Sequence, residues 1–181
     1  MIFGLKKSKL NNSVLIAEDN LFMSELLRQK LVNNGFNVSV AREGHEAIQK
    51  VMVEPPSVII LDASLPGDVD SFEVLSEIRE RYDSKKLAVL MLFASLEAES
   101  LDKAKTLGTN ASLVKSQTNT EEIISVVQAL INEPGLVIEP TIKSEPQPAT
   151  EIKVPEQVSP TEVTNSAERI LEILNRIKGE V

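Results

Sequence analysis

Carboxylates and one lysine stand directly after three short apolar runs of this chain. Each run has the composition of a buried strand, and the residues that end the runs are Glu18, Asp19, Asp62 and Lys115. If the runs form neighbouring parallel strands, these side chains meet, because parallel strands share one carboxyl-terminal edge. Three acids and one lysine at one edge suit a hard cation and a phosphoryl group.

The three acids predict a magnesium site. Neighbouring carboxylates repel one another, and the repulsion raises at least one pKa unless a cation is bound. Mg²⁺ prefers carboxylate and carbonyl oxygens together with retained water. We expect Glu18, Asp19 and Asp62 to bind it directly or through water, and the backbone carbonyl of Ser64 to complete the protein ligands. Lys115 is then the second cation for a phosphoryl group that arrives at Asp62.

Strand-like and helix-like patterns alternate between residues 13 and 132. The expected strands are 13–17, 37–41, 58–61, 87–92 and 111–114, and the expected helices are 21–33, 43–53, 71–82, 96–107 and 120–132. This alternation predicts an α/β fold with a parallel sheet and helices on both faces. Right-handed crossovers favour the doubly wound, flavodoxin-like strand order 2-1-3-4-5, which binds ligands after strands one and three. The acids follow those two strands.

Local signals predict how the helices begin and end. Gly35 is well placed to end the first helix in the left-handed conformation. Ser71 and Thr120 are the expected N-caps of the third and fifth helices. The apolar positions of the first helix begin at Leu21 and Phe22, near helical spacing.

The composition excludes several classes of function. The hydrophobic content of 42% is typical of a globular protein. A net charge of −8 argues against a general nucleic-acid binder and against a binder of anionic membranes. The absence of cysteine excludes a disulfide framework, thiol catalysis and a thiolate metal site. No apolar window is long enough to span a membrane, so a cytoplasmic location is the default expectation.

The composition also predicts four segments. Residues 1–12 form a leader with lysines after a short apolar patch, and residues 13–132 form the α/β domain. Residues 133–165 hold six of the nine prolines and are expected to be a disordered, Pro/Glu-rich linker. Residues 166–179 are expected to form a short amphipathic helix that packs onto the α/β domain, a second copy of the chain or another protein. Its apolar face is Ile170, Leu171, Ile173, Leu174 and Ile177.

Residues 13–132 resemble the receiver domain of two-component response regulators. The acidic pair in 14–20, the segment 58–67 followed by 70–75, and the lysine segment 112–115 are similar to the family's three motifs in their order. The resemblance implies that Asp62 is the phosphoacceptor, Glu18 and Asp19 are the metal acids, and Lys115 is the phosphate partner. It also implies a histidine kinase or histidine phosphotransfer protein as donor. The only chemistry it implies is self-phosphotransfer and autodephosphorylation, so no enzyme is expected.

Four positions depart from the family pattern. Phe93 stands where strand four of the family ends in threonine or serine, and phenylalanine donates no hydrogen bond. Ser116 replaces the usual cis-proline after the lysine, Ser112 replaces an aromatic residue, and Ser71 stands where glycine is usual. The acceptor chemistry is therefore expected to be retained while the standard switch is lost.

Three functions follow as alternatives. The first is a receiver that accepts a phosphoryl group on Asp62 in a phosphorelay and signals through protein contacts. The second is a degenerate pseudo-receiver that binds partners without phosphorylation, which Phe93 and Ser116 favour. The third is a small phosphatase on a similar sheet, whose nucleophile normally has a second Asp two residues on. Ala63 and Ser64 follow Asp62, which argues against that reading.

Overall fold

The computed structural model describes residues 12–95 and 97–139. Most of the predicted leader, residues 140–165 of the predicted linker and the predicted helix 166–179 lie outside the described residues, so those predictions stay untested. None of the helices in the described part of the chain has the length and apolarity needed to cross a membrane.

Five parallel strands form one sheet in the order β2-β1-β3-β4-β5, which confirms the predicted fold class. The central strands β3 and β4 are buried at every position, as expected for strands covered on both faces, whereas the edge strand β2 alternates in exposure. The strands are β1 (Ser13–Ala17), β2 (Asn37–Ala41), β3 (Val58–Asp62), β4 (Ala88–Phe93) and β5 (Ala111–Val114).

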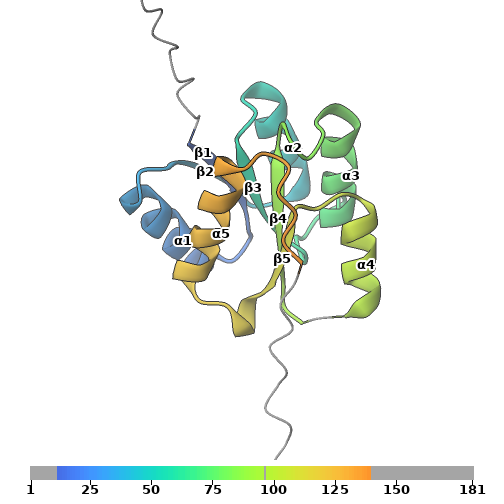
Figure 1. Ribbon diagram of the computed structural model, residues 1–181. Coiled ribbons are helices and arrows are strands. Elements are labelled where there is room, and N and C mark those ends of the chain that lie inside the picture. The colour runs from blue at the N-terminus through green and yellow to red at the C-terminus, as the bar shows by residue number, and fades with distance from the viewer. Residues whose placement is uncertain (1–11, 96, 140–181) are drawn as a thin grey trace, which may run out of the picture. The chain divides into compact units, whose positions relative to one another are not determined.

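Helices cover both faces of the sheet (Figure 1). They are α1 (Leu21–Asn33), α2 (Gly44–Val53), α3 (Ser71–Arg81), α4 (Ala98–Thr106) and α5 (Thr120–Asn132), with a 3₁₀ turn η1 (Lys115–Gln117) after β5. α1 and α5 lie on one face, and α2, α3 and α4 lie on the other. Each face has its own apolar cluster, and the alternating side chains of the strands contribute to both. This double packing holds the carboxyl-terminal edge of the sheet in place.

The N-caps of α3 and α5 lie one residue before the predicted positions, and the bounds of α2, α3 and α4 differ from the predicted ones by one or two residues. Asp70, not Ser71, is the N-cap of α3, because its carboxylate accepts hydrogen bonds from the backbone of Phe72 and Glu73, both at 2.8 Å. Asn119, not Thr120, caps α5 by accepting a bond from the Glu122 backbone. An N-cap depends on where a side chain meets the helix backbone, which neighbouring polar residues do not reveal.

The end of α1 follows the prediction, and the apolar residues of its first turn are exposed. Gly35 has φ of 84°, the left-handed conformation expected just after α1. Leu21 and Phe22, expected among the apolar positions of α1, are 66% and 78% exposed. They occupy the first turn of the helix, at the carboxyl edge of the sheet, and the buried side of α1 contains Leu27 and Leu31 instead.

The packed structure continues past α5, where the linker was expected to begin at residue 133. Residues 133–139, which we call the C-terminal strap, turn at Gly135 and return along the edge of β5. The Ile138 backbone N–H donates to the Asn110 carbonyl at 2.7 Å, and Ile138 pairs with Ala111 in a parallel bridge. Leu136 and Ile138, two residues apart, both pack against the apolar cluster under α5. These two apolar contacts hold the strap against the domain.

Candidate functional site

The carboxyl ends of β1, β3 and β5 bring three of the predicted residues into contact. Glu18 follows β1, Asp62 is the last residue of β3, and Lys115 follows β5. The Lys115 ammonium nitrogen Nζ lies 2.8 Å from Glu18 Oε2 and 2.8 Å from Asp62 Oδ2. These contacts join residues that are 97 and 53 positions apart in the chain.

The acids form a compact cluster at this edge. One carboxylate oxygen from each of Glu18, Asp19 and Asp62 lies within 4.8 Å of the others. Glu18 and Asp62 are buried, with 2% and 3% exposure, whereas Asp19 is exposed to solvent. Three carboxylates against one lysine leave a net negative charge, so the donor set fits a hard divalent cation such as Mg²⁺.

The residues after Asp62 orient its carboxylate. The Ser64 backbone N–H donates to Asp62 Oδ1 at 3.1 Å, while Oδ2 accepts from Lys115. The two oxygens therefore have different partners, one in the loop after β3 and one after β5. The role of the Ser64 carbonyl as a metal ligand stays a prediction.

The pKa shifts follow from this partly buried arrangement. Burial raises the pKa of Glu18, and the charge of Asp62 adds to the rise, although the hydrogen bond from Lys115 opposes it. Burial also disfavours the charged form of Lys115, but its hydrogen bonds to Asp62 and Glu18 outweigh burial and raise the Lys115 pKa. The lysine therefore stays protonated between the two carboxylates.

Ser71 supports the site in a way that sequence reasoning missed. Its side chain is buried, its hydroxyl donates to the Asp62 carbonyl, and the same oxygen accepts from the Leu65 backbone at 3.3 Å. These bonds tie the first residue of α3 to the end of β3 and to the loop between them. A serine at the start of a helix reads first as a cap, so the sequence carried no signal for this contact.

Phe93 lies beside the site and packs into the core. It follows Leu92, which pairs with Asp62 in the sheet, and it is only 3% exposed. Its ring belongs to the apolar cluster under α2, α3 and α4, together with Met91 and Ala104. The end of β4 therefore presents no hydroxyl to the acidic cluster.

The other departures lie on or near β5. Ser116 is exposed in η1, directly after Lys115. Ser112 is buried and lines a cavity of about 140 Å³ with Leu101 of α4 and Ile138 of the C-terminal strap. Where the family pattern has an aromatic residue on β5, this chain has a small side chain, a cavity and the strap.

Comparison with known proteins assigns the fold and the motifs to one family. The family model described as "Response regulator receiver domain" matches residues 14–128, more than half of the chain. A curated relative is the phosphate regulon transcriptional regulatory protein PhoB of Rhizobium meliloti (strain 1021). It is 31% identical over 119 residues, which are 65% of this chain and 51% of that protein. The chain thus spans about half the length of this relative.

Solved structures agree with this assignment. A putative response regulator from Chloroflexus aurantiacus J-10-fl aligns with a TM-score of 0.61 and 27% identity, over 67% of this chain and 98% of the other. The chemotaxis protein CheY4 of Vibrio cholerae aligns with a TM-score of 0.59 and 27% identity, over 65% of this chain and 96% of the other. A CheY-like receiver domain from Methanospirillum hungatei JF-1 aligns with a TM-score of 0.62 and 19% identity, over 66% of this chain and 93% of the other. At this identity the alignment supports the fold alone. The chain belongs to the response regulator receiver domain family of two-component systems.

Proposed function

We propose that this receiver accepts a phosphoryl group on Asp62, with Mg²⁺ bound by Glu18, Asp19, Asp62 and the Ser64 carbonyl. The observation that carries the proposal is the position of Lys115, 2.8 Å from both Glu18 and Asp62. A surface lysine would gain little from such an arrangement. A lysine that is 25% exposed between two buried carboxylates suits a site built to receive anionic oxygens.

The residues provide each part of a phosphoryl transfer. An Asp62 carboxylate oxygen forms the new P–O bond while the P–N bond of a phosphohistidine donor breaks, and the leaving imidazole takes a proton. Lys115 moves from its carboxylate partners to the phosphoryl oxygens, and the Ser64 N–H holds the acceptor carboxylate in place. Bound Mg²⁺ supplies the remaining positive charge, which is the main requirement of this reaction.

A donor protein has an apolar surface beside the site. Leu21 and Phe22 begin α1, two and three residues after Asp19, and both are largely exposed. Exposed apolar side chains next to a reactive group favour docking of another protein. We propose a histidine kinase or a histidine phosphotransfer protein as this donor, in the cytoplasm.

The output is proposed to run through protein contacts. Residues 166–179 would form an amphipathic helix that binds an unidentified partner protein or a second copy, connected by the linker 140–165. No contact with nucleic acid or membrane and no enzymatic turnover beyond self-phosphotransfer and autodephosphorylation is part of this proposal.

Beryllofluoride, a phosphoryl mimic, tests the acceptor role by amide NMR. In the presence of Mg²⁺ we expect chemical-shift changes at Ala63, Ser64 and Lys115. The Asp62→Asn variant should lose the beryllofluoride response while keeping the dispersed spectrum of a folded protein. Incubation with acetyl phosphate should add one phosphoryl group to the wild type and none to Asp62→Asn. An unchanged wild-type spectrum with Mg²⁺ and beryllofluoride present would reject the acceptor role.

A second candidate, the pseudo-receiver, is favoured by the position of Phe93. Phe93 is buried in the core and cannot donate a hydrogen bond to a phosphoryl group, so phosphorylation would not move the end of β4 in the usual way. In this case partner binding would not depend on Asp62. Full cellular activity of the Asp62→Asn variant would support the pseudo-receiver, and loss of activity would support the phosphorelay.

A further inference from the structure

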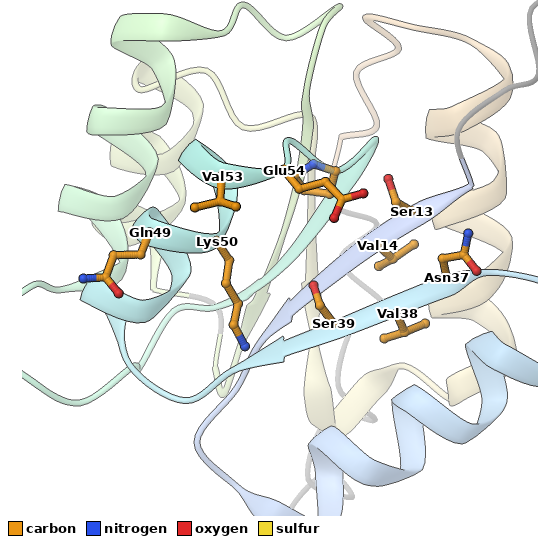
Figure 2. Close-up of a pocket in the computed structure, with 10 residues that line it drawn as sticks. Ser13, Val14, Asn37, Val38, Ser39, Gln49, Lys50, Val53 and Glu54 are labelled. Carbon is orange, nitrogen blue, oxygen red and sulfur yellow. The ribbon is translucent and has the colours of Figure 1, made fainter.

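A cavity lies at the amino-terminal end of the strands, opposite the acidic site. It is a groove of about 480 Å³ between α2 and the first residues of β1 and β2 (Figure 2). Ser13 of β1 lines one side with Asn37 and Ser39 of β2, and Lys50 and Val53 of α2 line the other. Its volume is in the range of sites that bind side chains or small ligands.

The groove exists because the strand residues beneath it are small. Ser13 pairs with Asn37 and Leu15 pairs with Ser39, so side-chain alternation places Ser13 and Ser39 on the same face as Leu15. Leu15 belongs to the apolar cluster that includes Ile48 and Val51 of α2, whereas Ser13, Asn37 and Ser39 line the groove. The amino-terminal end of this face is therefore left open.

An exposed apolar side chain stands on the rim. Val53, the last residue of α2, is 87% exposed, more than any other large apolar side chain that the structure describes. Isolated exposed valines are common, but this one adjoins an open groove. The combination offers a surface on which an apolar segment could pack.

We propose that residues 1–11 of this chain fold back and fill the groove with Ile2 and Phe3. The described chain begins at Asn12, whose carbonyl accepts from the Asn37 backbone at 2.9 Å, and Ser13 already lines the groove. The segment thus leaves the protein at the mouth of the cavity. Eleven extended residues reach roughly 36 Å, which allows a return along the groove.

Charge complements this fit. The segment carries Lys6, Lys7 and Lys9. Glu54 lines the groove and forms no ion pair with any other residue in the described part of the chain. The cation of α2, Lys50, is already engaged by Glu46 at 2.7 Å and by the Val40 carbonyl. The remaining charge available at the rim is therefore negative, and it suits a lysine-bearing segment.

A spin label tests the docking directly because the chain has no native cysteine. Gly4→Cys carries a nitroxide, and amide signals are compared between its oxidised and reduced forms. We expect the amides of Gln49 and Val53 to lose intensity, while amides of α5 on the opposite face keep theirs. Adding Ile2→Ser and Phe3→Ser should restore the signals, because the tether stays the same and only the apolar anchors change.

Paired rim variants provide an independent readout. Val53→Ser, which removes the apolar contact without adding charge, should also abolish the intensity loss, whereas Val32→Ser, at an exposed valine of α1, should leave it unchanged. A mixture of spin-labelled and isotope-labelled chains identifies the occupant. Broadening that arises only between chains would assign the groove to a second copy and overturn the proposal. Signals that are equally intense on both faces would overturn it too.

Discussion

Removal of the Lys115 charge is the most direct probe of the site. Lys115→Met keeps much of the side-chain volume but leaves Glu18 and Asp62 facing each other without a cation. Both carboxylates are nearly inaccessible to water, with side-chain exposures of 2% and 4%. Two buried negative charges without a neighbouring cation then destabilise the native state relative to the unfolded state. We expect the metal-free protein to be clearly less stable at pH 7.

The size of the effect follows from burial. Breaking a buried ion pair by removing one partner costs about 3–5 kcal/mol. Lys115 keeps 25% of its side-chain exposure, so the expected loss is smaller, about 2–4 kcal/mol. Proton uptake by Glu18, whose pKa burial already raises, limits the loss further at acid pH. With a typical urea dependence the unfolding midpoint would fall by about 1–2 M.

Urea unfolding in EDTA and then in Mg²⁺ measures this prediction. Mg²⁺ should stabilise Lys115→Met more than it stabilises the wild type, because the metal replaces the lost charge. Lys30→Met is the matched control: Lys30 lies 2.8 Å from Glu121, but their side chains are 43% and 65% exposed. Its loss should stay within about 1 kcal/mol.

Two results would refute the reasoning. Equal losses for Lys115→Met and Lys30→Met would show that burial does not strengthen the contacts of Lys115. An absence of Mg²⁺ rescue would show that the three carboxylates do not form a cation site. Either outcome would remove the main support for phosphoryl transfer at Asp62.

Three other predictions test neighbouring features. The native state raises the pKa of Glu18 above 4.5, so the free energy of unfolding in EDTA should fall as the pH rises from 4.5 through the raised pKa. Urea unfolding at a series of pH values measures this fall, and the Glu18→Gln variant should lack it. Asn110→Ala removes four hydrogen bonds, which join Asn110 to α3, to β4, to the loop between α3 and β4, and to the C-terminal strap. The free energy of unfolding, measured by heat or urea, should fall by about 2–4 kcal/mol. Phe93→Thr should lower the free energy of unfolding by about 2–4 kcal/mol, because it leaves a cavity in the core. If the switch lacks only a hydroxyl, the same variant should extend the beryllofluoride-induced NMR shifts to α4.

The order of the strands was predictable because its signals are local. Apolar runs with helical patterns between them require a parallel sheet, and chirality leaves few orders for five such units. The same runs place acids and a lysine at strand ends, so the meeting of Glu18, Asp62 and Lys115 followed from topology alone. Phe93 lies one residue beyond the expected strand 87–92, and the structure makes it the buried last residue of β4.

Other contacts depend on distances between elements that no local pattern encodes. The hydroxyl of Ser71 reaches the Asp62 carbonyl only because α3 begins beside the end of β3. The C-terminal strap is rich in residues that favour a linker, yet Ile138 pairs with Ala111 because an unpaired strand edge lies within reach.

The amino-acid sequence by itself determined the fold, the family motifs and the edge of the sheet where charge collects, since periodicity and strand ends are properties of neighbouring residues. Only the tertiary structure decided which hydroxyls support the acceptor, where the chain after α5 packs, and that a groove remains open under α2. Those outcomes depend on whether side chains from separate elements fill the space between them, and this is settled only when the elements are packed together.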